Sequence, residues 1–260
     1  MSYIEISHAT ASFNVRAQKF VAFEDVSLKI EKGEFVCILG ASGCGKSTLL
    51  NAIAGFVPVT EGSVVIDGVE VKRPSTRRVM IFQNYGLLPW RTVVGNVELG
   101  LEQNPELSKK ERRDVAEKYV ELVGLSSFRK SYPRQLSGGM QQRTSIARAL
   151  AVKPDVVFMD EPFGALDAIT RMKLQDDVLK ISQEEKTTIV FVTHDIGEAV
   201  YLADRIVILS SSPGRVKCII NVPEGRDFRN RASDSFASIQ NKTLELFNLA
   251  PTRDPIEYYI

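Results

Sequence analysis

The stretch that decides the fold is Gly40-Ala-Ser-Gly-Cys-Gly-Lys-Ser-Thr48. It follows the apolar run Phe35–Leu39 (FVCIL) and leads into an apolar helical face at Leu49, Leu50 and Ile53. A strand, a glycine-rich loop and a helix in this order form a cradle for phosphate. Glycines let backbone N–H groups point inward, and the helix N-terminus adds partial positive charge. The spacing GxxxxGK[ST] therefore predicts a site for a nucleoside triphosphate.

Two side chains complete this predicted site. Lys46 is expected to reach the β and γ phosphates, and the Ser47 hydroxyl is expected to ligate Mg²⁺. The predicted nucleotide-binding residues of the loop are Gly40, Ala41, Ser42, Gly43, Cys44, Gly45, Lys46, Ser47 and Thr48.

Composition limits the class of protein. The 260 residues are 44% hydrophobic and 25% charged, which is typical of a globular chain. A net charge of +1 argues against nucleic-acid binding through a broad cationic surface. Three widely spaced cysteines, Cys37, Cys44 and Cys218, favour a reducing compartment. With no signal-like start and no apolar run long enough to span a bilayer, we expect a soluble or peripheral protein.

Short apolar runs predict a parallel sheet buried on both faces. They are Phe35–Leu39, Val79–Phe82, Val156–Met159, Thr188–Val192 and Ile206–Leu209. Period-two alternation in the first thirty residues and a hairpin pattern around Asp67-Gly68 predict an antiparallel β-subdomain beside that core.

Helical patterning replaces strands between Gln83 and Lys153, with a capping box at Ser108 and Glu111. We therefore expect an α/β fold with a RecA-like P-loop NTPase core, the N-terminal antiparallel subdomain and an inserted α-helical subdomain. The predicted nucleotide-binding domain covers residues 3–230, with the insertion at about 86–152. A short helical tail is expected at 231–260.

Two further motifs carry chemistry. The apolar run Val156–Met159 ends in Asp160 and Glu161, and burying carboxylates there is costly unless a cation or hydrogen bonds compensate. Asp160 is predicted to hold Mg²⁺ and Glu161 to polarise the attacking water, although acids also cap ordinary buried strands. Leu136–Arg143 (LSGGMQQR) opens a helix with a serine and two glycines, which is a second anion-binding device or a plain serine cap.

Together with Gln83, Leu166-Asp167 and His194, these motifs resemble the ATP-binding subunits of ABC transporters from about residue 3 to about 225. The resemblance implies an ATPase that pairs head to tail as a homodimer. ATP would lie between one P-loop and residues of the second copy: Ser137, Gly138, Gly139 and Gln142.

The resemblance also implies roles for single residues. Gln83 would contact Mg²⁺ and water, His194 would contact the γ-phosphate and orient water, and Asp167 would communicate across the dimer. Phe13 is the best match for the aromatic ring that stacks on adenine. Because Asn14–Phe23 is longer than usual, Phe20 or Phe23 remain alternatives, with Phe13 then packed in the core.

Three segments resemble importers of the nitrate, sulfonate and taurine group: Gln83–Arg91, Asp160–Ala168 and Ser210–Arg215. Taurine is the first expectation, and Leu87–Trp90 is expected to receive a helix of a membrane subunit or to pack in the core. The implied assembly is a peripheral ATPase on the cytoplasmic face of the inner membrane. Its partners would be two integral membrane permease subunits and, through them, an extracytoplasmic solute-binding protein, with no nucleic acid. The alternatives are a soluble ABC ATPase acting on DNA, ribosomes or iron–sulfur assembly, and a non-hydrolysing nucleotide sensor.

Overall fold

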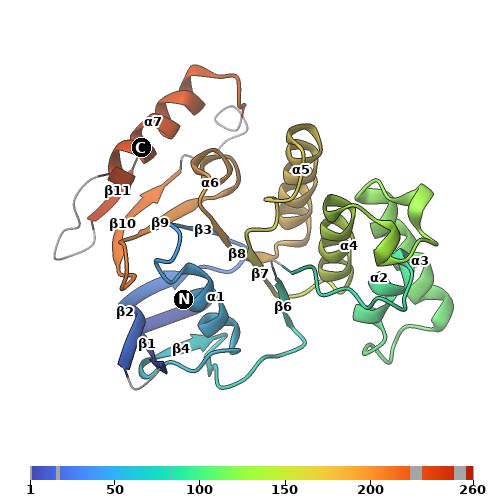
Figure 1. The fold of residues 1–260 in the computed structure, drawn as a ribbon, viewed down its shortest axis with the longest axis horizontal. Helices are drawn as coiled ribbons and strands as arrows, with labels where there is room; N and C mark the ends of the chain where they lie inside the picture. Colours follow the sequence, from blue (N-terminus) through green and yellow to red (C-terminus); the bar gives the residue numbers. More distant parts are fainter. Residues whose placement is uncertain (1, 16–17, 83, 223–229, 249–255, 260) are drawn as a thin grey trace. The chain divides into compact units, whose positions relative to one another are not determined.

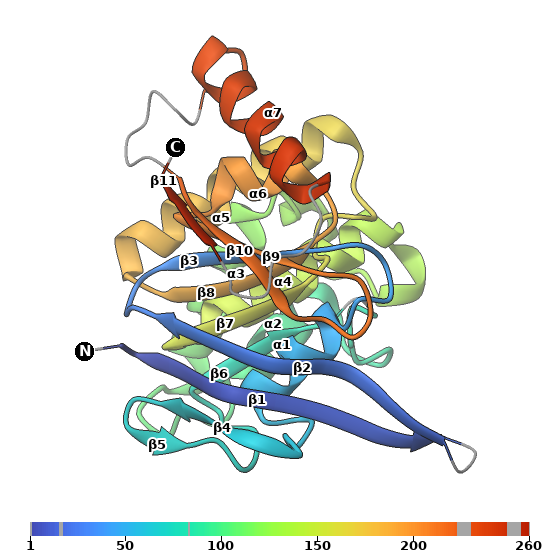
Figure 2. The same ribbon diagram turned by 90° about the vertical axis from the view of Figure 1, so that its left-hand side faces the viewer.

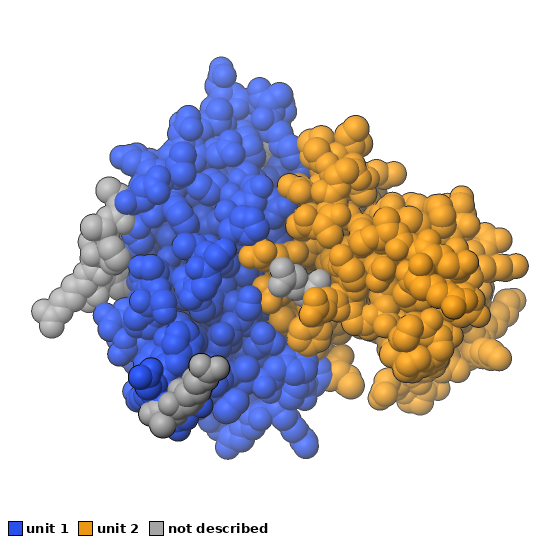
Figure 3. All heavy atoms as spheres, in the orientation of Figure 1, with its two compact units in different colours: residues 1–75, 188–260 blue, residues 76–187 orange. Residues whose placement is uncertain are grey.

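A computed structural model describes residues 2–15, 18–82, 84–222, 230–248 and 256–259. The chain divides into two compact units, which Figure 3 colours separately. The first unit contains residues 1–75 and 188–260, and the second contains residues 76–187.

The first unit contains a four-stranded antiparallel sheet in the order β2-β1-β4-β5 (Figure 2). Its strands are β1 (Ile4–Val15), β2 (Gln18–Ile30), β4 (Glu61–Ile66) and β5 (Val69–Glu70). Asp67 and Gly68 both have positive φ, at 53° and 73°, as a two-residue hairpin turn requires. This part confirms the predicted antiparallel subdomain and its hairpin.

A second sheet in this unit has the order β11-β10-β9-β3-β8. Its strands are β3 (Phe35–Leu39), β8 (Thr188–Thr193), β9 (Arg205–Leu209), β10 (Val216–Asn221) and β11 (Ile256–Tyr259). Strand β3 is parallel to both β8 and β9, and all residues of β3 and β8 are buried. The apolar runs Phe35–Leu39, Thr188–Val192 and Ile206–Leu209 therefore form the buried parallel strands that their composition predicted.

Three helices cover these strands (Figure 1). Helix α1 (Lys46–Ala54) packs against β1, β2 and β8 and so lies between the two sheets. Helix α6 (Ile196–Leu202) packs against β3 and β8, and α7 (Asp234–Asn248) packs on α6. The apolar pattern of the tail thus forms α7, but strand β11 was not predicted.

The second unit pairs two parallel strands, β6 (Arg78–Ile81) and β7 (Val156–Asp160), with Arg78 opposite Val156. Its other elements are α2 (Val93–Leu101), α3 (Lys109–Leu122), the short 3-10 turns Ser126–Phe128 and Pro133–Gln135, α4 (Gly138–Ala151) and α5 (Ala168–Glu185). The predicted capping box is present, since Ser108 Oγ accepts from Glu111 N at 3.3 Å and Glu111 accepts from Ser108 N at 2.8 Å. The unit is larger than the helical segment expected at 86–152, because β6, β7 and α5 belong to it.

Across the described ranges, none of the helices combines the length and the hydropathy that crossing a membrane requires.

Candidate nucleotide-binding and hydrolysis site

The glycine-rich loop connects β3 to α1 and encloses its lysine. Lys46 is the first residue of α1, is 5% exposed, and donates from Nζ to the carbonyls of Gly40 at 2.9 Å and Ala41 at 3.0 Å. Gly45 caps the helix in a left-handed conformation with φ 95° and offers no side-chain acceptor. The first turn of α1 therefore faces the loop with its backbone N–H groups and its positive dipole end, as phosphate binding requires.

Strand β2 and the β9–β10 connection pack against the glycine-rich loop. A Cβ on Gly45 would lie 2.3 Å from the Ala22 carbonyl, so only glycine allows this approach. The same carbonyl accepts from Gly214 N at 3.0 Å, and Glu24 N donates to Gly214 O at 2.9 Å. A Cβ on Gly214 would lie 2.2 Å from the Cys44 carbonyl, so the loop packs closely against both of these segments.

The three aromatic candidates for adenine stacking differ in exposure. Phe23 is fully buried and packs in the core, so it does not present a free ring. Phe13 is 37% exposed and Phe20 is 48% exposed, and the two are direct cross-strand partners at the end of the β1–β2 hairpin. Cross-strand partners share one face of a sheet, so the structure presents two adjacent rings.

His194 follows the last residue of β8, and its side chain is exposed. The next residue, Asp195, caps α6 by accepting from Glu198 N at 3.0 Å. The histidine therefore lies in a short, hydrogen-bonded connection between a buried strand and a helix, in the same unit as the P-loop.

The two predicted carboxylates end β7 in the second unit. Asp160 is the last strand residue and is 8% exposed, whereas Glu161 is partly exposed and has φ 47°. Residues other than glycine rarely adopt positive φ, and such conformations cluster at functional sites. The two adjacent acids therefore differ in burial and in backbone conformation, and their separate roles stay predictions.

The second anion-binding device is the start of α4. Ser137 caps this helix by accepting from Met140 N at 3.3 Å, and Ser137 and Gly138 are exposed. Gln142 is only 2% exposed, and its Nε2 has no hydrogen-bond partner among the described residues. The side chain thus lies on the inner face of α4, and its expected contact with ATP on a second copy stays a prediction. Asp167 is exposed and caps α5 by accepting from Thr170 N at 3.0 Å, a bond that lowers the pKa of its carboxyl.

Gln83 lies outside the described residues, so its predicted contacts with water and Mg²⁺ stay predictions. The residues after it are held firmly by a side chain that sequence reasoning missed. Arg148 of α4 donates to the carbonyls of Gly86 at 2.7 Å and Tyr85 at 3.0 Å, and burial lowers the pKa of its guanidinium.

A second missed residue, Asn96, is fully buried in α2 and organises the loop before it. It accepts from Leu88 N at 2.7 Å and donates to the carbonyls of Leu88, Arg91 and Thr92 at 3.0–3.1 Å. Its only sequence signal was a polar residue inside an otherwise apolar helical run.

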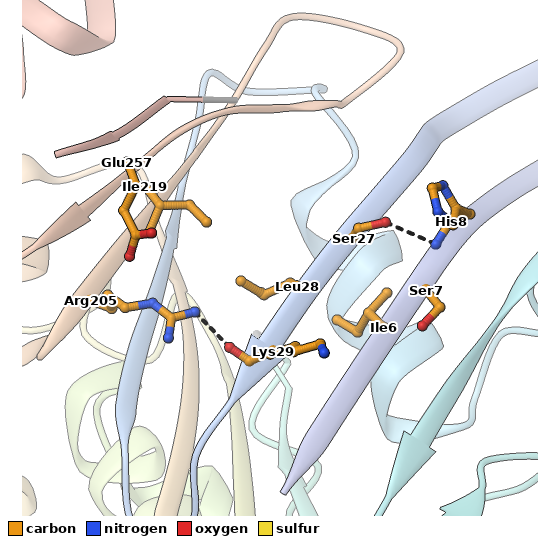
Figure 4. Close-up of a pocket in the computed structure, with 9 residues that line it drawn as sticks. All are labelled: Ile6, Ser7, His8, Ser27, Leu28, Lys29, Arg205, Ile219 and Glu257. Carbon is orange, nitrogen blue, oxygen red and sulfur yellow. Dashed lines mark hydrogen bonds between the residues drawn. The ribbon is translucent and has the colours of Figure 1, made fainter. Parts of the chain in front are cut away.

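A separate hollow of about 470 Å³ lies between β1–β2 and β9–β11 (Figure 4). Figure 4 shows Arg205 directed toward the backbone of Lys29, whose carbonyl accepts from it at 2.6 Å. Each basic side chain there already pairs with a carboxylate: His8 with Asp25 at 2.7 Å, Lys29 with Glu5 at 3.2 Å and Arg205 with Glu34 at 3.1 Å. The positive charges that could bind a phosphate in this hollow are therefore neutralised by carboxylates, unlike the positive charge at the P-loop.

The parallel strands and the glycine-rich cradle with its enclosed lysine define a P-loop nucleotide-binding protein. Comparison with known proteins identifies the family to which this nucleotide-binding protein belongs. The family model described as ABC transporter matches residues 23–164. The chain belongs to the ABC transporter family, as an ATP-binding cassette with ATPase activity.

Several relatives cover nearly the whole chain. An uncharacterized ABC transporter ATP-binding protein of Methanocaldococcus jannaschii is 47% identical over 94% of this chain and 90% of its own length. The nitrate import ATP-binding protein NrtD of Synechococcus elongatus is 44% identical over 87% of this chain and 84% of its own. The aliphatic sulfonates import ATP-binding protein SsuB of Bacillus cereus is 44% identical over 94% and 95%.

A solved structure agrees with the fold. A dimeric ATP-binding cassette in a post-hydrolysis state, bound to ADP and Pi, superposes with a TM-score of 0.78 at 35% identity. The match covers 85% of this chain and all of that one. The predicted fold class and family are confirmed. The importers described here are named for nitrate and aliphatic sulfonates, so taurine stays a prediction.

Proposed function

We propose that this chain is the motor subunit of an importer and that it hydrolyses ATP at sites completed by a second copy. The observation that carries the proposal is the presence of two separate anion-binding helix starts, at Gly45 and at Ser137. One triphosphate needs only one such cradle in its own subunit. Two copies arranged head to tail would use both, each P-loop facing Ser137–Gly139 of the other copy. The solved dimeric cassettes support this pairing.

Within such a site, the chain's own groups have distinct tasks. Lys46 would leave the carbonyls of Gly40 and Ala41 and bind the β and γ phosphates. Glu161 would accept a proton from the attacking water, and His194 would bind the γ-phosphate and orient that water. Gln83 would contact the water, and Asp167 would communicate the presence of ATP in one site to the second copy.

The residues present also fit Mg²⁺. The hydroxyl of Ser47 and the carboxylate of Asp160 would supply hard oxygen ligands of the kind that Mg²⁺ binds, and Gln83 would add an amide oxygen. Bound Mg²⁺ supplies charge neutralisation on the phosphates during transfer.

A surface in the second unit suits a membrane partner. Trp90 is 70% exposed, and Asn96 fixes the backbone of the loop that presents it. An exposed aromatic ring on a prearranged loop is typical of a protein interface. We propose that Leu87–Trp90 receives a helix of a permease subunit. The chain would then work on the cytoplasmic face of the inner membrane with two permease subunits and an extracytoplasmic solute-binding protein.

The cargo is proposed to be a small anion or sulfonate, because relatives are named for nitrate and aliphatic sulfonates. Taurine is the member of this group that the sequence motifs favour. Vesicles reconstituted with this chain, its permeases and the binding protein would show ATPase stimulation by taurine, an alkanesulfonate or nitrate. No stimulation by any of the three would refute the cargo assignment.

The catalytic proposal has its own test. Glu161→Gln should abolish turnover while retaining ATP, so that size-exclusion chromatography detects an ATP-bound dimer. Normal hydrolysis in this variant would remove Glu161 from the reaction.

A further inference from the structure

A buried carboxylate lies directly beneath the connection that carries His194. Glu198, on the first turn of α6, is 8% exposed, and its Oε2 accepts from the hydroxyl of Thr193 at 2.7 Å. Thr193, the last residue of β8, is 2% exposed. A buried carboxylate is costly unless hydrogen bonds compensate, so this pair is a built feature rather than ordinary core packing.

The same hydroxyl also holds the backbone on the far side of His194. Thr193 Oγ1 accepts from Asp195 N at 3.0 Å, and Asp195 Oδ1 accepts from Glu198 N at 3.0 Å. These three bonds close a ring of Thr193, Asp195 and Glu198 around the histidine position. Both neighbours of His194 are therefore tied to the start of α6.

The ring is also close to the strand that leads into the P-loop. Helix α6 packs against β3 and β8, and Cys37 of β3 is opposite Phe191 of β8. The pKa of the Cys37 thiol is raised by burial and by the negative charges of Glu198 and Asp195, while Lys46 lowers it. The carboxylates of the ring and the P-loop lysine thus shift the pKa of one buried thiol in opposite directions.

We propose that Thr193 and Glu198 are positioning residues for His194. They act by fixing the peptide units before and after the histidine, so that its exposed ring keeps one direction toward the γ-phosphate. This inference rests on the proposed role of His194 in hydrolysis. Misplacing a catalytic group by about 1 Å lowers the rate on the order of a hundredfold. The gain in rate from fixing His194 can therefore offset the cost of burying the Glu198 carboxylate.

A purely structural role predicts a different outcome. If the ring only capped α6, its loss would lower thermal stability and leave turnover per folded molecule unchanged. The two roles are separated by comparing variants that remove the hydroxyl with a control that loses a similar bond elsewhere. Thr243 supplies that control, because it is fully buried in α7 and its hydroxyl donates to Ile239 O at 2.8 Å.

The experiment measures kcat, KM for ATP and the melting temperature for Thr193→Val, Thr193→Ser and Thr243→Val. Thr193→Val keeps the shape but removes the hydroxyl, so kcat should fall about tenfold or more while KM changes by less than about twofold. Thr193→Ser restores the hydroxyl and should recover most of kcat. Thr243→Val should lower the melting temperature by a similar amount and leave kcat unchanged.

Two Glu198 variants test the carboxylate independently, in case Thr193→Val does not fold. Glu198→Gln keeps an acceptor for the hydroxyl and should retain most of kcat. Glu198→Leu removes the acceptor and should match Thr193→Val. Turnover of Thr193→Val and Glu198→Leu at the level of the Thr243→Val control would overturn the inference.

His194→Ala separates this inference from the proposed function. If His194→Ala hydrolyses ATP normally, the role assigned to the histidine fails, and the positioning role fails with it. If His194→Ala is inactive while Thr193→Val is active, only the positioning role fails. Adding Thr193→Val to His194→Ala should cause no further loss of residual turnover, because both changes remove the same contribution of the His194 side chain. An additive loss contradicts the inference.

Discussion

The paired rings at the end of the β1–β2 hairpin predict how the chain holds adenine. Phe13 and Phe20 are cross-strand partners and are both exposed. The strand that carries Phe20 also contributes Ala22, whose carbonyl faces Gly45 of the P-loop. We therefore expect both rings, rather than Phe13 alone, to contact the base.

The size of the effect follows from the exposed area. A phenylalanine offers about 150–250 Å² for burial, so exposures of 37% and 48% leave about 70–100 Å² uncovered on each residue. At about 25 cal/mol per Å², covering half of that area stabilises the complex by about 1 kcal/mol per ring. Each change to alanine should then weaken ATP binding about five- to tenfold, and the double change about fiftyfold.

Calorimetric titration with a non-hydrolysable ATP analogue measures this directly. Tripolyphosphate should bind Phe13→Ala and Phe20→Ala as it binds the parent chain, because it has no base. Phe56→Ala is the matched control, since Phe56 is 46% exposed in the same unit. Unchanged ATP affinity in the double variant, or an equal loss for tripolyphosphate, would show that the two rings do not bind the base.

Further predictions concern three other sites. Lys46→Ala should abolish detectable ATP binding at micromolar concentrations while the melting temperature stays near that of the parent; unchanged affinity contradicts the phosphate role. Arg148→Met removes both bonds to the loop after Gln83, and should lower kcat and destabilise the second unit by about 2–3 kcal/mol in urea unfolding, since charged hydrogen bonds to carbonyls are lost. Burial raises the pKa of Glu34, so the folded chain keeps this proton to a higher pH than the unfolded chain does. The stability that this group contributes is present below pH 4.5, the ordinary pKa, and is lost as pH rises through the folded pKa. Glu34→Gln should therefore flatten this part of the curve of unfolding free energy against pH. An unchanged slope would contradict the raised pKa.

The elements that sequence reasoning predicted well are those with strong local signals. Phe35–Leu39 and Thr188–Thr193 are uninterrupted β-branched or apolar runs, and they form fully buried strands. Ser108 and Ser137 carry helix-cap signals that depend only on residues three positions away, and both cap helices as expected. Local physics decides these features, so one sequence suffices for them.

The residues that were missed act through contacts distant in sequence or have little local signal. Arg148 binds carbonyls more than sixty positions earlier in the chain, and its neighbours in the sequence do not indicate these contacts. Strand β11 is only four residues long and exists because β10 offers an edge beside it. Gln142 is buried by helix packing, which its place in a motif does not indicate, and its contact with ATP on a second copy stays a prediction.

Mixing two inactive variants tests whether each ATP site combines the P-loop of one copy with Ser137–Gly139 of another. Lys46→Ala disables the P-loop, and Ser137→Asp keeps a good helix cap while placing a negative charge against phosphate. Each homodimer should be inactive, but a mixed dimer contains one complete site. With random pairing, the mixture should recover up to about a quarter of parental ATPase activity. A mixture no more active than its separate components would show that the two copies do not complete each other's ATP sites.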